Sequence, residues 1–166
     1  MNDPTVEQAA IETPFGTMRL VTDGRAILAL EFDAPGIAMT PLSFAARQLA
    51  DAVARRLDAY FAGERVAFDV PLAPWGTPFQ QSVWNALCGI PYGETVSYAE
   101  IARRVGRPSA VRAVGAANGA NPIAIVIPCH RVIGANGTLT GYGGGLDRKR
   151  ALLLLEAPAP FARFAA

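Results

Sequence analysis

The sequence is poor in the residues that crosslink a small protein or bind metal. Among its 166 residues, cysteine occurs only as Cys88 and Cys129, and histidine only as His130. Structural and catalytic zinc sites need clustered cysteine or histidine ligands, so we expect no metal and no other cofactor. A reducing compartment keeps thiols free, and we expect both cysteines to be thiols rather than a disulfide.

The sequence also lacks long hydrophobic runs. No apolar stretch approaches the roughly 20 residues that span a bilayer, and the first seven residues lack the basic start and apolar middle of a signal peptide. We therefore expect a cytoplasmic protein without a membrane partner, and no obligate protein partner is evident. Because 51% of the residues are hydrophobic, the chain is able to form a core in one domain or two small ones.

The net charge of +1 conceals an asymmetry between the two halves of the chain. Residues 1–91 carry six arginines and ten acidic residues, whereas residues 92–166 carry nine basic and four acidic residues. The net charges of the two halves are therefore −4 and +5. A basic segment favours contact with a phosphate backbone, although an excess of this size also occurs on ordinary solvated surfaces.

The amino-terminal part is expected to begin as a sheet. Two short runs of branched residues, 17–22 and 26–32, flank Asp23-Gly24-Arg25, which predicts a hairpin with a glycine-containing turn. Residues 66–72 alternate enough to predict a further strand. Prolines and a glycine then interrupt the pattern, and we place a linker near residues 72–77.

Between these strands, residues 43–62 predict a helix that covers the sheet. Apolar residues recur there at helical spacing, with Ser43 as the N-cap and Gly63 just past the end. The expected apolar face consists of Phe44, Leu49, Val53, Leu57, Tyr60 and Phe61.

The second part is expected to open with a helix over residues 78–88. Thr77 caps this helix, a proline occupies its first position, and Gly89 ends it. Its apolar side includes Trp84 and Cys88, which we interpret as core residues.

Two short helices joined by a tight turn follow and have the outline of a helix-turn-helix. Ser97 and Glu100 have the spacing of a capping box for the first helix, which ends near Gly106. Ser109 is the expected cap of the second, over residues 110–118. The second helix offers mostly small residues, which suit either a nucleic-acid groove or close packing against other helices.

The run Ile-Val-Ile-Pro-Cys-His-Arg-Val, residues 125–132, places a thiol, an imidazole and a guanidinium side by side. A free cysteine titrates near ~8.5, so a nucleophilic thiolate needs a nearby base or positive charge, and His130 and Arg131 supply both. The alternative is that Cys129 simply packs at the end of an apolar strand. Because Pro128 cannot donate to a sheet ladder, it favours a turn that exposes the thiol.

The Pro-Cys-His-Arg-Val motif at 128–132 resembles the active-site signature of O6-alkylguanine-DNA alkyltransferases. Four further segments resemble family blocks in the family's order, so that the resemblance covers most of residues 77–156. The chain is also close in length to the stand-alone bacterial form. The four segments are 90–98, 111–115, 118–122 and 141–146.

The resemblance implies a two-part α/β fold. Residues 1–74 correspond to a small mixed sheet-plus-helix domain, ribonuclease H-like, with a structural role. Residues 75–166 correspond to a mostly α-helical, winged-helix-like DNA-binding domain that contains the active site.

The implied function is repair of double-stranded DNA that contains O6-alkylguanine. Cys129 accepts the alkyl group from guanine O6, and also from thymine O4, after the damaged nucleotide is flipped out. The transfer is direct and irreversible, because the thioether product is stable. Each molecule therefore acts once.

The resemblance also implies roles for individual residues. His130 takes the proton of the thiol through a water molecule, and Glu156 holds His130. Asn121 braces the turn around the active site. The hydroxyl of Tyr98 donates to the leaving guanine.

Further residues correspond to those that meet the DNA. Arg112 enters the duplex where the nucleotide has swung out, and Val132 lines the pocket and presents its carbonyl to the guanine amine. Some relatives carry a serine hydrogen-bond donor at the position of Gly143. Here a backbone N–H of Tyr142 or Gly143 replaces it, and we predict tolerance of alkyl groups larger than methyl.

Three alternatives remain at this stage. The first is an alkyltransferase-like protein that binds the lesion without repairing it. Such proteins lack the nucleophilic cysteine, whereas Cys129 is present here. A cysteine hydrolase would release its product and turn over. A winged-helix DNA-binding protein would use the basic half alone and leave Cys129 unreactive.

Overall fold

The computed structural model describes residues 5–36 and 41–165, which fall into two compact units. The first unit comprises the chain up to Trp75 together with the short segment Pro122–Ala124. The second comprises Gly76–Asn121 and the chain from Ile125 onward. Within the two described ranges, no helix combines the length and apolar character needed to cross a membrane.

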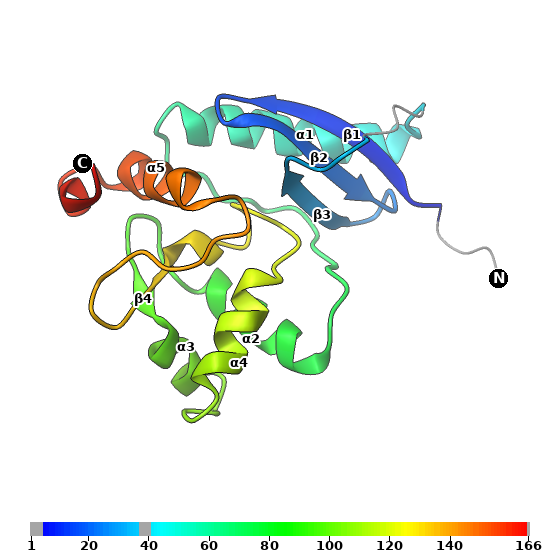
Figure 1. The fold of residues 1–166 in the computed structure, drawn as a ribbon. Coiled ribbons are helices and arrows are strands. Elements are labelled where there is room, and N and C mark those ends of the chain that lie inside the picture. The colour runs from blue at the N-terminus through cyan, green and yellow to red at the C-terminus, as the bar shows by residue number, and fades with distance from the viewer. Residues whose placement is uncertain (1–4, 37–40, 166) are drawn as a thin grey trace. The chain divides into compact units, whose positions relative to one another are not determined.

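The first unit contains a three-stranded antiparallel sheet in the order β1-β2-β3 (Figure 1). Its strands are β1 (Glu7–Thr13), β2 (Gly16–Thr22) and β3 (Ile27–Phe32). The predicted hairpin is β2–β3 and is confirmed. Its turn contains Gly24 at a φ of 81°, a left-handed conformation that glycine adopts without strain. The sequence analysis missed β1, which is rich in residues without a strong strand preference.

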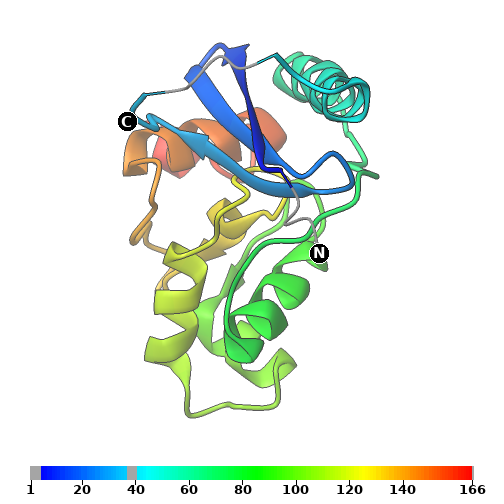
Figure 2. The ribbon, with the colours of Figure 1, turned by 90° about the vertical axis from the view of Figure 1, so that its right-hand side faces the viewer.

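Helix α1 (Phe44–Phe61) covers one face of this sheet (Figure 2). The predicted cap is confirmed, since Ser43 Oγ accepts a hydrogen bond of 3.2 Å from the N–H of Ala46. Phe44 is 76% exposed, which corrects its expected place on the apolar face. It is the first helical residue and precedes the buried row. That row consists of Ala46, Ala50, Val53, Leu57 and Tyr60.

The strand predicted over residues 66–72 does not form. Only Leu72 pairs, as a single parallel bridge to Ile27. Ile27 N–H donates to Pro71 O at 2.8 Å, and Ala73 N–H donates to Ile27 O at 2.9 Å. Because Pro71 has no N–H, it cannot extend this ladder.

A second short segment completes the edge of β3. Leu30 N–H donates to Pro122 O at 2.8 Å, and Ala124 N–H donates to Leu30 O at 2.8 Å. Ile123, between them, is fully buried. The first unit therefore includes three residues that come from the later part of the chain.

The second unit is mostly helical. Its two-residue strands β4 and β5 pair in parallel, with Val96 opposite Val132 and Ser97 opposite Ile133. The predicted class, a small sheet and helix followed by a mostly helical part, is confirmed. The elements of this unit are α2 (Pro78–Cys88), β4 (Val96–Ser97), α3 (Tyr98–Arg104), α4 (Val111–Gly119), the 3-10 helix η1 (Cys129–Arg131), β5 (Val132–Ile133), α5 (Leu146–Glu156) and the 3-10 helix η2 (Ala162–Phe164).

Helix α2 begins as predicted, with Thr77 as its cap. Gln80 N–H donates to Thr77 Oγ1 at 3.2 Å, and Thr77 N–H donates in return to Gln80 Oε1 at 2.9 Å. Trp84 is buried, and its Nε1–H donates to Ala117 O at 2.8 Å, which joins α2 to α4. Cys88 is exposed, so its assignment to the core was wrong. It is the last residue of the helix, beyond the row of side chains that packs inward.

The two helices of the predicted helix-turn-helix are present, with different caps. Ser97 accepts the N–H of Glu100 as expected, but the Glu100 carboxylate pairs with arginines of its own helix, so only half of the capping box forms. Helix α4 begins after Ala110, without a side-chain cap, rather than after Ser109. Ser109 lies instead in a turn, which the 2.9 Å hydrogen bond from Ala110 N–H to Arg107 O closes.

The end of the chain packs back on the second unit. Ile133 of β5, Leu153 of α5 and Phe161 form a buried group. This C-terminal cluster holds β5 and α5 together, and partly buried side chains surround it. These are Leu139, Leu154, Ala157 and Phe164.

Candidate active site

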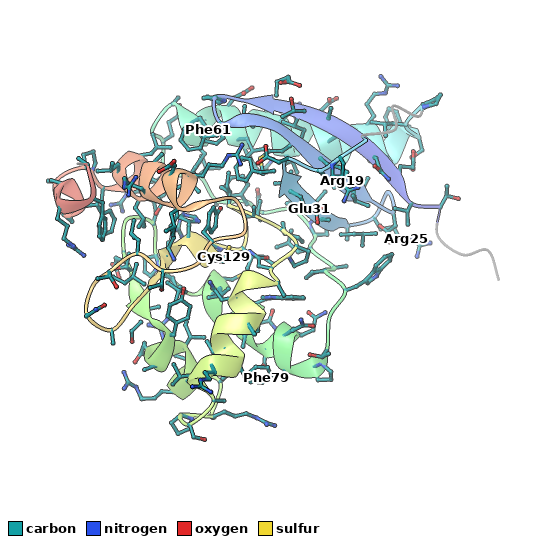
Figure 3. All side chains as sticks on the ribbon, viewed as in Figure 1. Arg19, Arg25, Glu31, Phe61, Phe79 and Cys129 are labelled. Atoms are coloured by element: carbon teal, nitrogen blue, oxygen red, sulfur yellow. The ribbon has the colours of Figure 1, made fainter. Side chains whose placement is uncertain are left out.

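Cys129 is the first residue of η1 (Figure 3) and is only 6% exposed. The expectation that Pro128 would expose the thiol is therefore wrong. The preceding apolar residues form turns instead of a strand, with Ile125 at a φ of 70°. Ile125 and Ile127 are each 2% exposed, and their burial carries the segment into the core.

Two asparagines hold the backbone on either side of the thiol. Asn121 Nδ2–H donates to Ile127 O at 2.8 Å, and Asn118 Nδ2–H donates to Cys129 O at 3.4 Å. Asn118 is 3% exposed and lies near the end of α4. The sequence analysis assigned a role only to Asn121. An asparagine at a helix end beside an Asn-Pro pair was the available signal for Asn118.

Burial raises the pKa of the Cys129 thiol above its ordinary value. A hydrogen bond from Asn121 and the positive charge of Lys149 act in the opposite direction, and burial outweighs them. At neutral pH the thiol is therefore protonated. A nucleophilic role needs a base close to the sulfur.

His130 is positioned to be such a base. Its Nε2 lies 2.7 Å from Glu156 Oε1, and both side chains are fully buried. Burial lowers the pKa of His130 despite the opposing effect of Glu156, so the ring is neutral near pH 7. A neutral ring that donates Nε2–H to a carboxylate leaves Nδ1 as a proton acceptor. Nδ1 is buried and has no hydrogen-bond partner among the residues that the structure describes.

Arg131 was expected to assist the thiol, but it binds Glu156 instead. Its Nε–H and an Nη2–H donate to the two oxygens of Glu156, each at 2.9 Å, and an Nη1–H donates to Ile90 O at 2.7 Å. Gly93 N–H adds a bond of 3.1 Å to Glu156 Oε2. Burial favours the protonated acid, but bonds from His130 and Arg131 outweigh it and lower the pKa of Glu156 to about 2.

Lys149 is a charged residue of the site that the sequence analysis missed. It is fully buried in α5, and its Nζ donates to Val132 O at 2.6 Å and to Thr140 O at 2.8 Å. It precedes Glu156 by seven residues, so two turns of one helix place both groups on the same face. That spacing, in a segment otherwise rich in leucine, was the signal in the sequence.

The other residues with predicted roles differ in their surroundings. Tyr98, the first residue of α3, donates its hydroxyl to Thr140 O at 3.1 Å. Val132 is fully buried, and its carbonyl accepts the bond from Lys149. The hydroxyl of Tyr142 is buried, and burial raises the pKa of this phenol well above its ordinary value. Gly143 is exposed.

Arg112 lies apart from the thiol, in the first turn of α4. It is exposed, and its side chain makes no hydrogen bond or ion pair with the described part of the chain. Asn118, by contrast, lies at the other end of the same helix. Helix α4 therefore presents an unoccupied guanidinium at one end and holds the backbone of Cys129 at the other.

The structure thus brings Cys129, His130, Glu156 and Asn121 together and adds Lys149. Across residues 5–36 and 41–165, no three or more histidine, cysteine, aspartate or glutamate residues gather in a way that could hold a metal ion. The chemistry available here is that of a thiol beside a neutral imidazole.

Comparisons with known proteins cover both units. Residues 7–74 match the family "6-O-methylguanine DNA methyltransferase, ribonuclease-like domain", and residues 78–158 match "6-O-methylguanine DNA methyltransferase, DNA binding domain". A methylated-DNA–protein-cysteine methyltransferase of Methanosarcina acetivorans is 69% identical over 102 residues. That alignment covers 61% of this chain and 65% of the relative.

Solved structures are similar over almost the whole chain. The O6-methylguanine methyltransferase of Mycobacterium tuberculosis is 49% identical with a TM-score of 0.80, and the match covers 93% of this chain and 94% of that one. The structure of the Mycobacterium tuberculosis protein in complex with DNA is 48% identical with a TM-score of 0.81, covering 96% and 99%. The chain belongs to the O6-methylguanine-DNA methyltransferase family.

Proposed function

We propose that this protein repairs duplex DNA by transferring an alkyl group from guanine O6 to the sulfur of Cys129. The observation that carries the proposal is the state of His130. Its Nε2–H is committed to Glu156, so Nδ1 is the acceptor, and the ring is neutral near pH 7. A buried, protonated thiol and a buried, unprotonated base occupy consecutive residues.

The reaction balances without a cofactor. His130 Nδ1 takes the thiol proton through a water molecule, and the thiolate attacks the alkyl carbon. The S–C bond forms as the C–O6 bond breaks, and the guanine receives a proton from the hydroxyl of Tyr98. The proton taken up by His130 then returns to Tyr98 through water, so that the thiol proton ends on the guanine. The imidazolium that forms faces the ionised Glu156, which stabilises it. The thioether is stable, so the transfer is irreversible and stoichiometric.

DNA recognition is assigned to α3 and α4. Arg112 has the freedom to enter the duplex, because its side chain has no partner among the described residues. Guanine O6 is not accessible to in-line attack inside the base stack, so the nucleotide must flip out, which costs on the order of a few kcal/mol. Val132, Tyr142 and Gly143 then line the site of the flipped base, and Asn121 keeps the thiol segment in place.

The division of labour along the chain is part of the proposal. Residues 75–166 bind DNA and carry out the transfer, and residues 1–74 have a structural role. We also include O4-alkylthymine as a substrate and the cytoplasm as the compartment. Both cysteines are free thiols in the structure, and a reducing compartment preserves a reactive thiol.

A mass-spectrometric experiment tests the transfer. The protein is incubated with duplex DNA that contains one O6-methylguanine, digested, and searched for the modified residue. We expect one added methyl group per protein, on the peptide that contains Cys129, and none on Cys88. The Cys129→Ser variant should remain unmodified while still binding the DNA. Unmodified wild-type protein would indicate a lesion-binding protein, and repeated release of product would indicate a hydrolase.

A further inference from the structure

Lys149 is the only lysine of the chain, and it is fully buried. All other side-chain cations of fixed charge are arginines. An ammonium group in a protein interior costs free energy unless it is hydrogen-bonded and its charge has a partner. Lysines usually lie at the surface, where they keep a protein soluble. Lys149 is buried, so its charge needs another explanation.

The hydrogen bonds of Lys149 are satisfied, but its charge is not neutralised by a carboxylate. Its Nζ donates to the carbonyls of Val132, Thr140 and Gly141, at 2.6, 2.8 and 3.4 Å. It forms no ion pair with the described residues. Glu156, the carboxylate on the same face of α5, is already bound by His130 and Arg131.

The geometry relates this charge to the thiol. Segment 129–132 runs beside α5, and His130 and Arg131 contact Glu156 while Val132 contacts Lys149. Helix α5 thus presents one acid and one cation, seven residues apart, along this segment. Glu156 is bound by His130. Lys149 is therefore available to interact with a negative charge that forms on Cys129.

We propose that Lys149 is a positioning residue whose ammonium group stabilises the Cys129 thiolate and whose three carbonyl bonds fix β5 to the loop that carries Tyr142. This inference rests on the proposed alkyl transfer, because only a reacting thiol needs such a charge. The charge interaction is mutual: the ammonium favours the thiolate, and the thiolate favours the ammonium. Burial lowers the pKa of Lys149 to about 8, so the group is still charged at neutral pH.

Other titratable groups also face this region and are kept constant in the test. They are His130 of η1, Glu156 of α5, and the phenols of Tyr98 and Tyr142. Tyr98 contributes its ring, whose centroid lies 6.0 Å from Lys149 Nζ. Before the reaction the His130 ring is neutral and the guanidinium of Arg131 is bound to Glu156, so Lys149 is the cation whose charge acts on the thiol.

The first experiment measures the thiol without DNA. In a Cys88→Ser background, the rate of alkylation by iodoacetamide is followed from pH 5.5 to 10 in the parent, Lys149→Met, Lys149→Arg and Arg150→Gln proteins. Arg150 is the matched control, a cation of α5 that pairs with Asp147. We expect Lys149→Met to lower the alkylation rate by roughly tenfold or more between about pH 6 and 7.5, where the ammonium is charged, because loss of a nearby opposite charge raises the pKa of the thiol. Lys149→Arg should largely restore the rate, and Arg150→Gln should leave it unchanged.

A second measurement covers the case in which Lys149→Met does not fold. Because the chain has one lysine, NMR of lysine labelled with carbon-13 at Cε follows a single side chain. Its titration midpoint should fall in Cys129→Ser, which removes the thiolate. An unchanged lysine midpoint in Cys129→Ser, or an unchanged alkylation rate between about pH 6 and 7.5 in folded Lys149→Met, would overturn the inference. Neither readout uses DNA, so failure of methyl transfer by the wild type would overturn the proposed function alone.

Discussion

His130 Nε2 and Glu156 Oε1 lie 2.7 Å apart between two side chains with no exposed surface. The bond fixes which nitrogen of His130 carries the proton and therefore which one accepts. Glu156→Gln keeps the size but removes the charge. We expect methyl transfer to slow by roughly 10² to 10⁴-fold, the usual contribution of an oriented general base. Single-turnover transfer to the protein, measured by quenched flow, gives this rate.

The same substitution should also destabilise the fold, because Arg131 loses its carboxylate partner inside the protein. Breaking a buried ion pair costs about 3–5 kcal/mol. The double variant Arg131→Met, Glu156→Gln is the control, and it should recover part of the stability but not the rate. A double variant that recovered the rate would contradict the role assigned to Glu156.

The stability of the protein should fall as the pH falls below neutrality. Burial lowers the pKa of His130 in the folded protein below the 6.5 of an exposed histidine. Near and below pH 6.5 the unfolded chain therefore binds more protons than the folded protein, and stability falls with pH. The bonds from His130 and Arg131 outweigh burial and lower the pKa of Glu156 from 4.5 to about 2 in the folded protein. Its contribution to stability is therefore present above pH 4.5 and lost progressively below it. Urea unfolding between pH 7.5 and 3.5 measures both steps.

Glu156→Gln should flatten the lower step of that curve and leave a loss near pH 6.5. Asp147→Asn is the control, since the Asp147 side chain is 98% exposed. A free energy of unfolding that stays constant from pH 7.5 to 5 would show that His130 is not buried as a neutral ring.

The two asparagines beside the thiol should differ in their effects. Asn121 favours the thiolate by a hydrogen bond, whereas Asn118 bonds the carbonyl of Cys129 at a longer 3.4 Å. We expect Asn121→Ala to raise the pKa of Cys129 and Asn118→Ala to change it less. Each should cost about 1–3 kcal/mol of stability, because a buried partner is left unsatisfied. Iodoacetamide rates against pH, combined with thermal unfolding, separate the two effects.

Arg112→Ala should weaken repair of duplex DNA while leaving the chemistry intact. A side chain that enters the duplex contributes about 1–3 kcal/mol, so we expect repair to slow by roughly 5 to 150-fold. Free O6-benzylguanine needs no base flipping and should react at the parental rate. Arg19→Ala is the control, because Arg19 lies in the first unit and is held by Glu31. Equal losses on duplex and free base would place Arg112 in a structural role.

Gly143→Ser should fold normally and alter the preference for the alkyl group. A Cβ at this position meets only the carbonyl of Gly119 at 3.8 Å, an ordinary contact. The added hydroxyl offers a donor for O6, and the side chain takes space. We expect the ratio of benzyl to methyl repair rates to fall relative to the parent. A wild type that reacts only with methyl adducts would contradict the predicted tolerance of larger groups.

The local signals in the sequence were enough for α1, α2, α3 and the hairpin, whereas the predicted cap of α4 was wrong and α5 was not predicted. Ser43, Thr77 and Ser97 each cap a helix as predicted, because capping depends on residues within one turn. The strand over residues 66–72 was wrong because strand formation depends on a distant partner, and only Leu72 finds one. The burial of Cys129 was missed for the same reason, since it depends on how α2 and α5 pack around η1.

Within the site, the sequence analysis named the thiol, the base and Glu156, but not the partner of Arg131 or the buried Lys149. Arg131 follows His130 directly, yet its guanidinium binds Glu156, 25 positions away in the chain. Lys149 was overlooked because one lysine in a basic stretch resembles a surface residue. Only the fold shows that it is buried against three carbonyls.

The C-terminal cluster sets a limit on how the chain is engineered. Glu156 is the last reactive group, so a protein shortened directly after it would keep every atom of the proposed chemistry. It would lose Phe161, which packs against Ile133 and Leu153. Without Phe161, α5, which carries Glu156, would be held less firmly against β5. Tags and fusion partners should therefore be attached beyond Phe164, where they leave the C-terminal cluster intact.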